Sequence, residues 1–460
     1  MFPLKKLLVL GAGESGVGAA LLASRKGWDV FVSDGGEIKE DFRKELDAAG
    51  VAYEGGGHSE KAFSGVDLVV KSPGISGTAA AVLRLREAGV PVISEIEFAA
   101  RYVGASKIIA ITGSNGKSTT TKLVYHLLQT AGMSVSLTGN IGYSLARQIA
   151  EAPTDWYALE ISSFQLDDIV DFQPDVAVVL NITPDHLDRY EYSLEKYAAA
   201  KMRITENQGA EDYLILSADD SRLENAFVVK GTAAQVARFS VEKSCGENGV
   251  VACKNGDHLV VKISGKSLSF PVQKLAVKGR HNEANALAAA TAALLAGVSP
   301  EAIATGLQTF SGLPHRLEPV GSINGVQFIN DSKATNVDSV WYALDSMTTP
   351  IILILGGQDK GNDYGQIQAL VSGKVKAIVC MGVDNAPIHA AFDALGIPVV
   401  DTASAEKAVA AALGLATAGD TVLLSPACAS FDLFKNYEDR GQKFREAVQK
   451  YSLSLSSQPA

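Results

Sequence analysis

Three features that would assign a sequence to a specialised class are scarce or missing in this 460-residue chain. The first is a run of basic residues: none is longer than Lys5-Lys6, and the net charge of the chain is −10. A nucleic-acid backbone is therefore a poor partner, because binding it requires clustered positive charge. Cysteines are the second: the four present form no C-x-x-C pair and no metal-ligand spacing. We expect neither a zinc site nor a disulfide framework, which fits a reducing cytoplasm.

Long hydrophobic runs are the third missing feature. The N-terminal apolar run, residues 7–10, is too short for the hydrophobic region of a signal peptide. The longest stretch of small apolar residues, 284–297, contains Asn285 and Thr291 and falls short of a membrane span. We therefore expect a cytoplasmic protein without a transmembrane segment.

What the sequence does contain is glycine at the ends of short apolar runs, where the strand-to-helix turns of an α/β protein need conformational freedom. Strands that alternate with helical patterns predict parallel sheets covered by helices. The predicted strands are residues 7–10, 30–33, 66–70, 107–111, 135–137, 157–161, 176–180, 213–216, 351–355, 377–381, 398–400 and 422–424. Length and the breaks in this alternation predict three domains, at residues 1–97, 98–312 and 313–460.

Two segments depart from the alternation. Residues 227–277 consist of short alternating runs with Asn-Gly and Ser-Gly turns, which predict a small antiparallel sheet. Residues 310–316 contain Gly312 and Pro314 and are typical of a hinge. The predicted fold class is therefore α/β, with parallel sheets throughout and a small antiparallel sheet in the central segment.

The strongest local motif is TGSNGKST at residues 112–119, which joins a predicted strand to an amphipathic helix. Backbone N–H groups of such a turn, together with the start of the helix, form a concave anion site. Lys117 adds a positive charge, and the hydroxyl of Ser118 can bind Mg²⁺. Ile111 stands where the general pattern has its first glycine, so only the shorter core GxxGKS is present. The motif predicts a triphosphate site, and the alternative is a plain strand-to-helix turn.

A second glycine turn, Gly11-x-Gly13-x-x-Gly16, follows the first strand and opens a helix, and Asp34 ends the next strand. This pattern matches the NAD fingerprint, with the acid placed for a ribose. A nucleotide-sugar diphosphate fits the same turn, and so does a turn that serves packing alone. The phosphate loop in the same chain favours an interpretation without redox chemistry.

Polar side chains also follow two strands of the central segment. Glu160 ends one predicted strand, and His186 and Asp188 follow another. Because ligands bind at the carboxyl ends of parallel strands, we expect these groups to face the same crevice as Lys117. A carboxylate and an imidazole there suit Mg²⁺, although each residue alone is also consistent with an ordinary capping or loop role. By its spacing alone, Lys201 is a solvated helix lysine.

Seven blocks together resemble the Mur ligase family of cell-wall precursor synthesis, and in particular its D-glutamate-adding branch. They are residues 112–119, 159–166, 185–190, 279–286, 313–316, 330–336 and 424–431. The first, fourth and fifth are similar to the whole family and its folate-ligase relatives. The sequences SKATN and SPACAS, within the last two blocks, are similar to the D-glutamate branch. The resemblance covers essentially the whole chain.

The resemblance implies an N-terminal Rossmann-like domain for the UDP part of a substrate, a central P-loop ATPase domain, and a C-terminal Rossmann-like domain for an amino acid. The UDP-substrate site it implies consists of Ser15, Gly35, Gly36, Ser72, Asn140 and His186. Gly35 and Gly36 stand where the family member compared has a threonine and an arginine.

The resemblance also implies an ATP site and two magnesium ions. The ATP-binding residues are Gly113, Ser114, Asn115, Gly116, Lys117, Ser118, Thr119, Asn285, Arg316 and Asp331, supported by His281 and Asn282. One Mg²⁺ is implied beside Ser118, Thr119 and Glu160. Lys201 matches a lysine that is carbamylated in the family, and the second Mg²⁺ is implied between it and His186. Carbamylation requires a neutral amine, and the pKa of lysine shifts when its surroundings disfavour charge. The implied catalytic residues are Lys117, Glu160, His186 and Lys201.

For the incoming amino acid, the resemblance implies a pocket made of Lys333, Thr335, Lys360, Ser430, Phe431 and Tyr437. Two lysines and several hydroxyls suit a dicarboxylate. The implied reaction transfers the γ-phosphate of ATP to the carboxylate of UDP-N-acetylmuramoyl-L-alanine, and the amine of D-glutamate then displaces phosphate. We expect a monomer that acts on these small molecules.

Three alternatives remain at this point. A sibling ligase that adds another amino acid, or glutamate to folate, shares most of the motifs. An NAD-linked dehydrogenase would use the glycine turn at residues 11–16 and would not need Lys117. A nucleotide-binding switch would use the phosphate loop for conformational control, and it leaves the lysines of the third segment unexplained.

Overall fold

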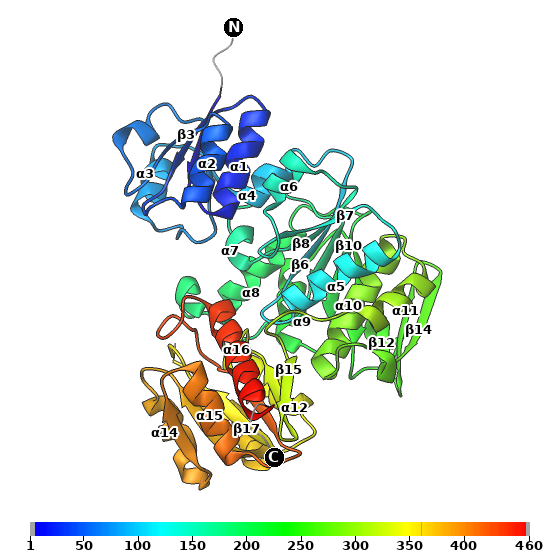
Figure 1. Cartoon of the computed structure of the whole chain (residues 1–460). Coiled ribbons are helices and arrows are strands. Elements are labelled where there is room, and N and C mark those ends of the chain that lie inside the picture. The colour runs from blue at the N-terminus through cyan, green and yellow to red at the C-terminus, as the bar shows by residue number, and fades with distance from the viewer. Residues whose placement is uncertain (1–4, 360, 457–460) are drawn as a thin grey trace. The chain divides into compact units, whose positions relative to one another are not determined.

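A computed structural model describes residues 5–359 and 361–456, which contain three β-sheets surrounded by helices (Figure 1). The chain divides into two compact units. The first consists of Met1–Ala276 with Glu283–Phe310, and the second of Val277–Asn282 with Ser311–Ala460. The first unit contains two of the sheets and the second unit contains the third.

The first sheet has five parallel strands in the order β3-β2-β1-β4-β5. Its strands are β1 (Lys6–Leu10), β2 (Asp29–Ser33), β3 (Ala52–Glu54), β4 (Leu68–Lys71) and β5 (Val92–Ser94), and its helices are α1 (Glu14–Arg25), α2 (Glu40–Ala48), α3 (Ala80–Glu87) and α4 (Glu95–Ala100). The strand order reverses between β1 and β4. Ligands of open parallel sheets bind in the crevice at such a reversal, beyond the carboxyl ends of the strands.

The second sheet has nine strands in the order β14-β13-β12-β11-β10-β9-β6-β8-β7. The strands are β6 (Lys107–Thr112), β7 (Val135–Gly139), β8 (Trp156–Glu160), β9 (Val176–Val179), β10 (Tyr213–Ser217), β11 (Gln235–Ser240), β12 (Val250–Asn255), β13 (His258–Ile263) and β14 (Lys266–Pro271). Only the β12–β13 and β13–β14 pairs are antiparallel. The predicted antiparallel strands are present, and they continue the parallel sheet, because β11 pairs in parallel with both β10 and β12.

Several helices accompany the second sheet. They are α5 (Lys117–Thr130), α6 (Leu145–Glu151), α7 (Ser163–Leu166), α8 (Leu194–Met202), α9 (Ser221–Lys230), α10 (Arg280–Leu295) and α11 (Pro300–Thr309). Helix α6 carries Arg147, whose side chain is only 7% exposed. Its Nε lies 2.8 Å from Glu14 Oε1 and its Nη1 2.5 Å from Glu45 Oε2. Arg147 thus joins α6 to α1 and α2 of the first sheet.

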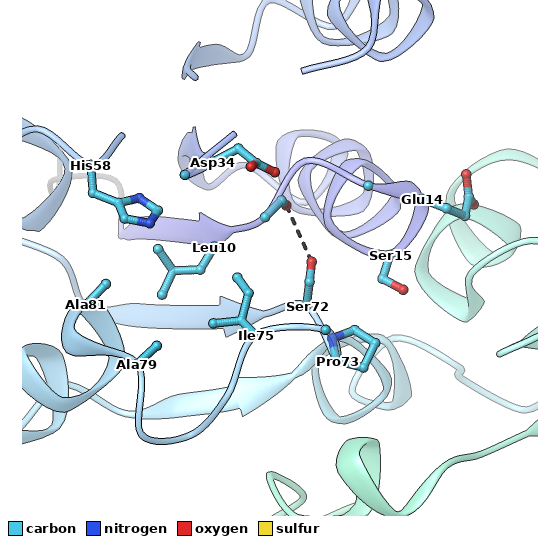
Figure 2. A pocket seen from close by; sticks show the side chains of 14 residues that line it. Leu10, Glu14, Ser15, Asp34, His58, Ser72, Pro73, Ile75, Ala79 and Ala81 are labelled. Atoms are coloured by element: carbon cyan, nitrogen blue, oxygen red, sulfur yellow. Dashed lines mark hydrogen bonds between the residues drawn. The ribbon is translucent and has the colours of Figure 1, made fainter. Parts of the chain in front are cut away.

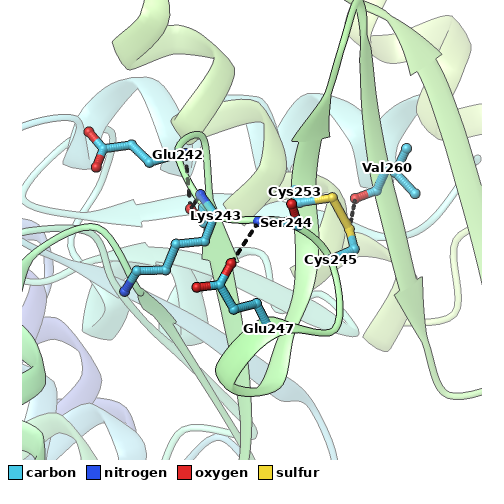
Figure 3. The surroundings of a disulfide bond; sticks show 8 residues. Glu242, Lys243, Ser244, Cys245, Glu247, Cys253 and Val260 are labelled. Carbon is cyan, nitrogen blue, oxygen red and sulfur yellow. Dashed lines mark hydrogen bonds between the residues drawn. A yellow bond between two sulfur atoms is a disulfide. The ribbon is translucent and has the colours of Figure 1, made fainter.

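One expectation from cysteine spacing is wrong. Cys245 and Cys253 form a disulfide, with their Cα atoms 5.3 Å apart (Figure 3). The turn between them includes Gly246 and Gly249, which have φ values of 92° and 76° and bring the chain back to the start of β12. Spacing alone did not reveal this pairing, since it depends on the reversal of the chain inside the turn.

The third sheet has six strands in the order β15-β16-β20-β17-β18-β19. Its elements are β15 (Glu318–Ile323), β16 (Val326–Asn330), α12 (Val337–Ser346), β17 (Ile351–Leu355), α13 (Gln368–Lys374), β18 (Val375–Met381), α14 (Ala386–Phe392), β19 (Val399–Thr402), α15 (Ala405–Leu415), β20 (Thr421–Leu424) and α16 (Tyr437–Ser456). Only the β15–β16 pair is antiparallel. Its turn is Asn324-Gly325, and both residues have positive φ, as tight hairpins require.

The predicted α/β fold class is confirmed by these parallel and mixed sheets. Among residues 5–359 and 361–456, no helix combines the length and the apolar character that crossing a bilayer demands.

Candidate active site

The phosphate loop joins β6 to α5, as the sequence predicts. Gly113 and Gly116 have φ values of 148° and 84°, a region that favours glycine. A Cβ atom at position 113 would lie 3.0 Å from Leu180 Cβ, and one at position 116 would lie 2.5 Å from Asn285 Oδ1. The loop therefore packs closely against its neighbours, and the side chain of Asn285 lies directly on it.

The chain that follows β9 holds the loop in place. Ser114 Oγ donates a hydrogen bond to the Thr183 carbonyl at 2.8 Å and accepts one from the Thr183 N–H at 2.9 Å. The Asn115 N–H donates to Asn181 Oδ1 at 2.8 Å, and Asn181 Nδ2 donates back to the Asn115 carbonyl at 3.0 Å. Since the loop is fixed before any ligand arrives, binding a phosphate there costs little additional ordering.

Two lysines converge on the start of this loop. Lys117 Nζ donates to the carbonyls of Gly113 and Ser114, at 2.8 and 2.7 Å. Lys201 Nζ donates to the Gly113 carbonyl at 2.9 Å, and the Lys201 residue is only 1% exposed. Burial lowers the pKa of Lys201 well below its usual value, the charge of Lys117 lowers it further, and the nearby carboxylates of Asp185 and Glu160 oppose the shift.

Glu160 ends β8, and its residue is only 1% exposed. Its Oε1 accepts a hydrogen bond from Asn140 Nδ2 at 3.0 Å, whereas its buried Oε2 has no hydrogen-bond partner among the described residues. Thr119 Oγ1, in the first turn of α5, is a second such buried oxygen. Oxygen atoms without protein donors suit a hard cation such as Mg²⁺, so the residues present fit that ion.

His186 lies on the loop after β9 and has a left-handed φ of 51°. Its ring packs edge-on against Phe164, with 5.2 Å between the ring centroids. Phe164 also contacts the guanidinium of Arg189, which donates to the carbonyls of Pro73 and Gly74 at 3.3 and 3.1 Å. The loop that carries His186 therefore contacts the turn that follows β4.

A cavity of about 530 Å³ opens at the carboxyl ends of β1 and β4, next to this turn (Figure 2). It lies at the strand-order reversal of the first sheet. Its lining includes Gly11, Gly13, Ser15, Asp34, Gly35, His58, Ser72 and Gly74.

The glycine turn forms one wall of the cavity. A Cβ atom at Gly11 would lie 2.7 Å from Ser72 Oγ, and one at Gly16 would lie 1.8 Å from the Gly11 carbonyl oxygen, so both positions require glycine for packing. Gly13 has no heavy atom within 4 Å of its Cβ position and faces open space. Asp34 accepts N–H hydrogen bonds on both carboxylate oxygens, from Ala12 at 2.6 Å and from Gly36 at 2.8 Å.

The structure places the predicted UDP-site residues in two regions. Ser15, Gly35 and Ser72 line the cavity. Gly36 does not line it, and Asn140 and His186 lie on loops of the second sheet. His58 is a lining residue that sequence reasoning missed; it sits in a polar turn with no motif, and its Nδ1 lies 2.7 Å from Ser33 Oγ.

In the second unit, the pKa of Asp331 depends on burial and on the positive charge of Arg316. Burial raises the pKa of Asp331 to about 6, and Arg316 together with a hydrogen bond from Ser425 Oγ at 2.8 Å opposes the rise. Burial, aided by Arg316, lowers the pKa of His281 to about 4. Arg316 Nε is buried and has no hydrogen-bond partner among the described residues, which suits an anionic ligand. Asn282 Nδ2 donates to the Lys278 carbonyl at 2.8 Å.

Five of the six residues predicted for the amino-acid pocket come after β16 or β20 in the chain. The structure brings Lys333 and Tyr437 together, with Lys333 Nζ 5.4 Å from the centre of the tyrosine ring. Ser430 is buried, whereas Thr335 and Phe431 are exposed. Lys360 lies outside the described residues.

Sequence reasoning missed Arg440, which is fully buried in α16. Its Nε and Nη2 donate to Ser332 Oγ and to the Ser332 carbonyl at 3.0 and 2.9 Å, and its Nη1 donates to the Cys428 carbonyl at 3.1 Å. Arg440 thus ties the SKATN block to the SPACAS block. An arginine within a mostly polar helix gives no sequence signal for such a role.

Comparisons with known proteins assign the chain to a family. Residues 6–80 match the MurD N-terminal domain, 111–293 the Mur ligase middle domain, and 315–428 the Mur ligase, glutamate ligase domain. Proteins named UDP-N-acetylmuramoylalanine--D-glutamate ligase from Bacteroides fragilis and Bacteroides thetaiotaomicron are 52% and 50% identical to it over 446 residues, which is 97% of this chain and 99% of each relative. The chain belongs to the Mur ligase family.

Two solved ligase structures share the fold. A pseudomurein peptide ligase type C from Methanothermus fervidus has a TM-score of 0.62 at 21% identity and covers 97% of this chain and 100% of its own. UDP-N-acetylmuramate-alanine ligase MurC from Thermotoga maritima has a TM-score of 0.62 at 20% identity and covers 98% and 100%. The resemblance drawn from the seven sequence blocks is thus confirmed, and this Mur ligase is an ATP-dependent amide ligase.

Proposed function

We propose that this Mur ligase joins D-glutamate to UDP-N-acetylmuramoyl-L-alanine in peptidoglycan precursor synthesis. The observation that supports this most is the preformed phosphate loop, which carries Lys117 and follows the strand that pairs with Glu160. Glu160 Oε2 and Thr119 Oγ1 are buried and have no hydrogen-bond partner among the described residues. The identity of the substrates is supported by the relatives of that name, which match nearly the whole chain. Monomeric assembly and a cytoplasmic location complete the proposal.

The reaction proceeds in two steps. The carboxylate of the UDP-linked substrate attacks the γ-phosphorus of ATP, ADP leaves, and an acyl phosphate forms. The amine of D-glutamate then attacks the acyl carbon, and the tetrahedral intermediate releases phosphate and gives the amide. Lys117, released from the carbonyls of Gly113 and Ser114, neutralises charge on the phosphates, while loop N–H groups orient them.

Magnesium is the proposed partner of the buried oxygens. Ser118, Thr119 and Glu160 would hold one ion, and His186 with a modified Lys201 would hold a second. Bound Mg²⁺ neutralises charge that develops on the transferred phosphoryl group. Asn140, through its 3.0 Å hydrogen bond, fixes one oxygen of Glu160 and leaves the other available.

Lys201 suits carbamylation. Its lowered pKa favours the neutral, nucleophilic form of the amine. In the proposed step the nitrogen bonds to the carbon of CO₂, and one proton leaves to solvent. The product is a carboxylate-like anion in place of the amine.

The cavity at the glycine turn is the proposed site of the UDP diphosphate. Gly13 leaves space for a ligand close to the backbone, and the N-terminus of α1 favours negative charge. The NAD alternative is disfavoured because the relatives that match nearly the whole chain are named as D-glutamate ligases. Arg316 and Asp331 are proposed to bind the nucleotide, and Lys333, Thr335, Lys360, Ser430, Phe431 and Tyr437 to bind D-glutamate.

The test is product mass after incubation with ATP, Mg²⁺, UDP-N-acetylmuramoyl-L-alanine and D-glutamate. We expect a product heavier than the UDP substrate by one glutamate residue, and phosphate release that requires both substrates. A panel with L-alanine, a diamino acid and folate substrates separates sibling activities. Equal turnover without an amino acid, or a preference for another panel member, would contradict the proposal.

A further inference from the structure

A separate group of side chains with metal-binding chemistry lies in the second unit. Cys380 is in β18, Asp401 is in β19, and His389 is in α14, which connects the two strands. One potential ligand atom from each lies within 4.8 Å of the other two, and this is the one such group of three or more found among the described residues. None of these residues belongs to the proposed ATP, UDP or amino-acid sites.

The spacing of these atoms is close to what a tetrahedral zinc ion needs. Zinc binds thiolate sulfur at about 2.3 Å and imidazole nitrogen or carboxylate oxygen at about 2.0 to 2.2 Å, which places neighbouring ligand atoms about 3.3 to 3.7 Å apart. His389 Nε2 and Asp401 Oδ1 are already 3.2 Å apart. Cys380 Sγ lies within 4.8 Å of a potential ligand atom of each of these residues, so it would move closer to them when a metal binds.

The second nitrogen of the His389 ring is held by another carboxylate. His389 Nδ1 lies 3.0 Å from Asp393 Oδ1, one helical turn further along the chain. Histidines that bind zinc usually donate their other ring N–H to a carboxylate or carbonyl, which fixes the ring and strengthens the ligand. Asp393 supplies this support and aims Nε2 at Asp401.

The surroundings also favour a divalent cation. His389 and Asp401 line a cavity of about 710 Å³, which gives access from solvent and room for a water ligand. Asp384 adds a negative charge to the cavity and Lys407 a positive one. Asn385 donates to Asp401 Oδ1 at 2.9 Å, and its own Oδ1 is buried without a hydrogen-bond partner among the described residues.

We propose that Cys380, His389 and Asp401 bind a zinc ion, with water in the fourth position and Asp393 as a positioning residue. Binding displaces the thiol proton of Cys380, since a thiolate is the zinc ligand. The spacing of the cysteines predicts no zinc site, because there is no C-x-x-C motif. The other two proposed ligands, Asp401 and His389, come from β19 and α14 and are not cysteines. The simpler alternative is a structural ion triplet in which a charged His389 pairs with Asp393 and Asp401 and no metal binds.

Cobalt titration of the full-length, chelator-treated protein separates these possibilities. Excess Mg²⁺ keeps the hard oxygen sites near the phosphate loop occupied. We expect one Co²⁺ per chain with a near-ultraviolet thiolate-to-cobalt band, and its loss on addition of Zn²⁺. The Cys380→Ser variant loses this band, whereas the matched variant Cys428→Ala, which alters another buried cysteine of the same unit, retains it.

Zinc affinity in competition with a chromophoric chelator gives a second readout. His389→Ala and Asp401→Ala alter half-buried and exposed residues, so they remain informative if Cys380→Ser does not fold. We expect each to weaken binding at least about tenfold, and Asp393→Asn to weaken it about 10- to 100-fold. Absence of stoichiometric binding, or affinity unchanged in His389→Ala, overturns the proposal and leaves the ion triplet.

Discussion

Lys117 and Lys201 donate hydrogen bonds to the same backbone oxygen, the carbonyl of Gly113, at 2.8 and 2.9 Å. Two ammonium groups on one acceptor repel each other, and burial makes the cost of the second charge large. Lys201 therefore gives up its proton more readily than an ordinary lysine. The neutral amine that carbamylation requires is therefore easier to form at Lys201 than at an exposed lysine.

The first prediction concerns the stability cost of Lys201. Because its pKa is lowered on folding, the unfolded chain binds more protons between that value and about 10.4, so the free energy of unfolding rises with pH over this window. In CO₂-depleted buffer, Lys201→Met should be more stable than the natural protein near neutral pH, where the buried amine of the natural protein is costly. The difference should shrink as the pH approaches about 10.

Thermal unfolding between about pH 6 and about pH 9 measures this effect. Lys196→Met is the control, because Lys196 lies on the same helix with its side chain 53% exposed. If the melting temperatures of the natural protein and of Lys201→Met change with pH in parallel, the burial of this amine does not affect stability.

The second prediction is that Lys117→Ala abolishes ligation. Removing a group that stabilises charge in the transition state lowers kcat by about 10²- to 10³-fold. The loop should persist, because its hydrogen bonds to Asn181 and Thr183 do not involve Lys117. Steady-state phosphate release gives the rate, and near-normal turnover in this variant would refute the proposed role.

The third prediction separates close packing from backbone strain in the phosphate loop. Gly116 and Gly132, at the two ends of α5, both have positive φ, but only Gly116 has a neighbour, Asn285 Oδ1, at its Cβ position. Gly116→Ala should lose ATP binding as measured by calorimetry. Gly132→Ala should cost only about 1 kcal/mol of stability and retain binding. Equal ATP affinity in the two variants would show that the Asn285 contact is unimportant.

The fourth prediction is a pH dependence that originates at Asp331. Its carboxyl group has a pKa of about 6, so it gains a proton as the pH falls through that value. If its negative charge helps to bind the nucleotide, the KM for ATP rises by up to about tenfold per pH unit below 6. Asp331→Asn should show a raised KM at every pH, and Asp345→Asn, an exposed residue of α12, should retain the natural profile.

The fifth prediction concerns the disulfide. Cys245 and Cys253 are separated by 8 residues, and closing so short a loop stabilises a fold by about 2.5 kcal/mol in the chain-entropy description. Reduction should increase hydrogen exchange in β12 and β13 and leave β17 unaffected. The Cys245→Ser variant should show the same increase without reductant; unchanged exchange in both would remove any structural role for this bond.

Most correct predictions came from patterns of residues that are contiguous in the sequence. Strand β6 and the loop before Lys117 were predictable because the strand, the glycines and the lysine are contiguous. The hairpin of β15 and β16 was missed, since the run EPVGSI contains a proline and a glycine and lacks a strand pattern. What a local pattern cannot show is which distant side chains meet.

The candidate site illustrates this limit. Asn140 bonds to Glu160 because β7 and β8 pair side by side, a relationship that only the sheet order reveals. The same applies to His58 in the first cavity and to Arg440, whose contacts lie 12 to 108 residues away along the chain. The resemblance to a family identified residues that lie in its motifs. His58 and Arg440 lie in none of those motifs, so the resemblance did not identify them.

Arg147 has a practical consequence for ligand discovery. A fragment cut after residue 97 would lack this guanidinium, leaving Glu14 beside the cavity and Glu45 on α2 with uncompensated charge. Such a fragment would offer screening compounds a more acidic and less rigid target than the whole enzyme does. Inhibitor campaigns aimed at the glycine turn should therefore keep α6 and the sheet that supports it.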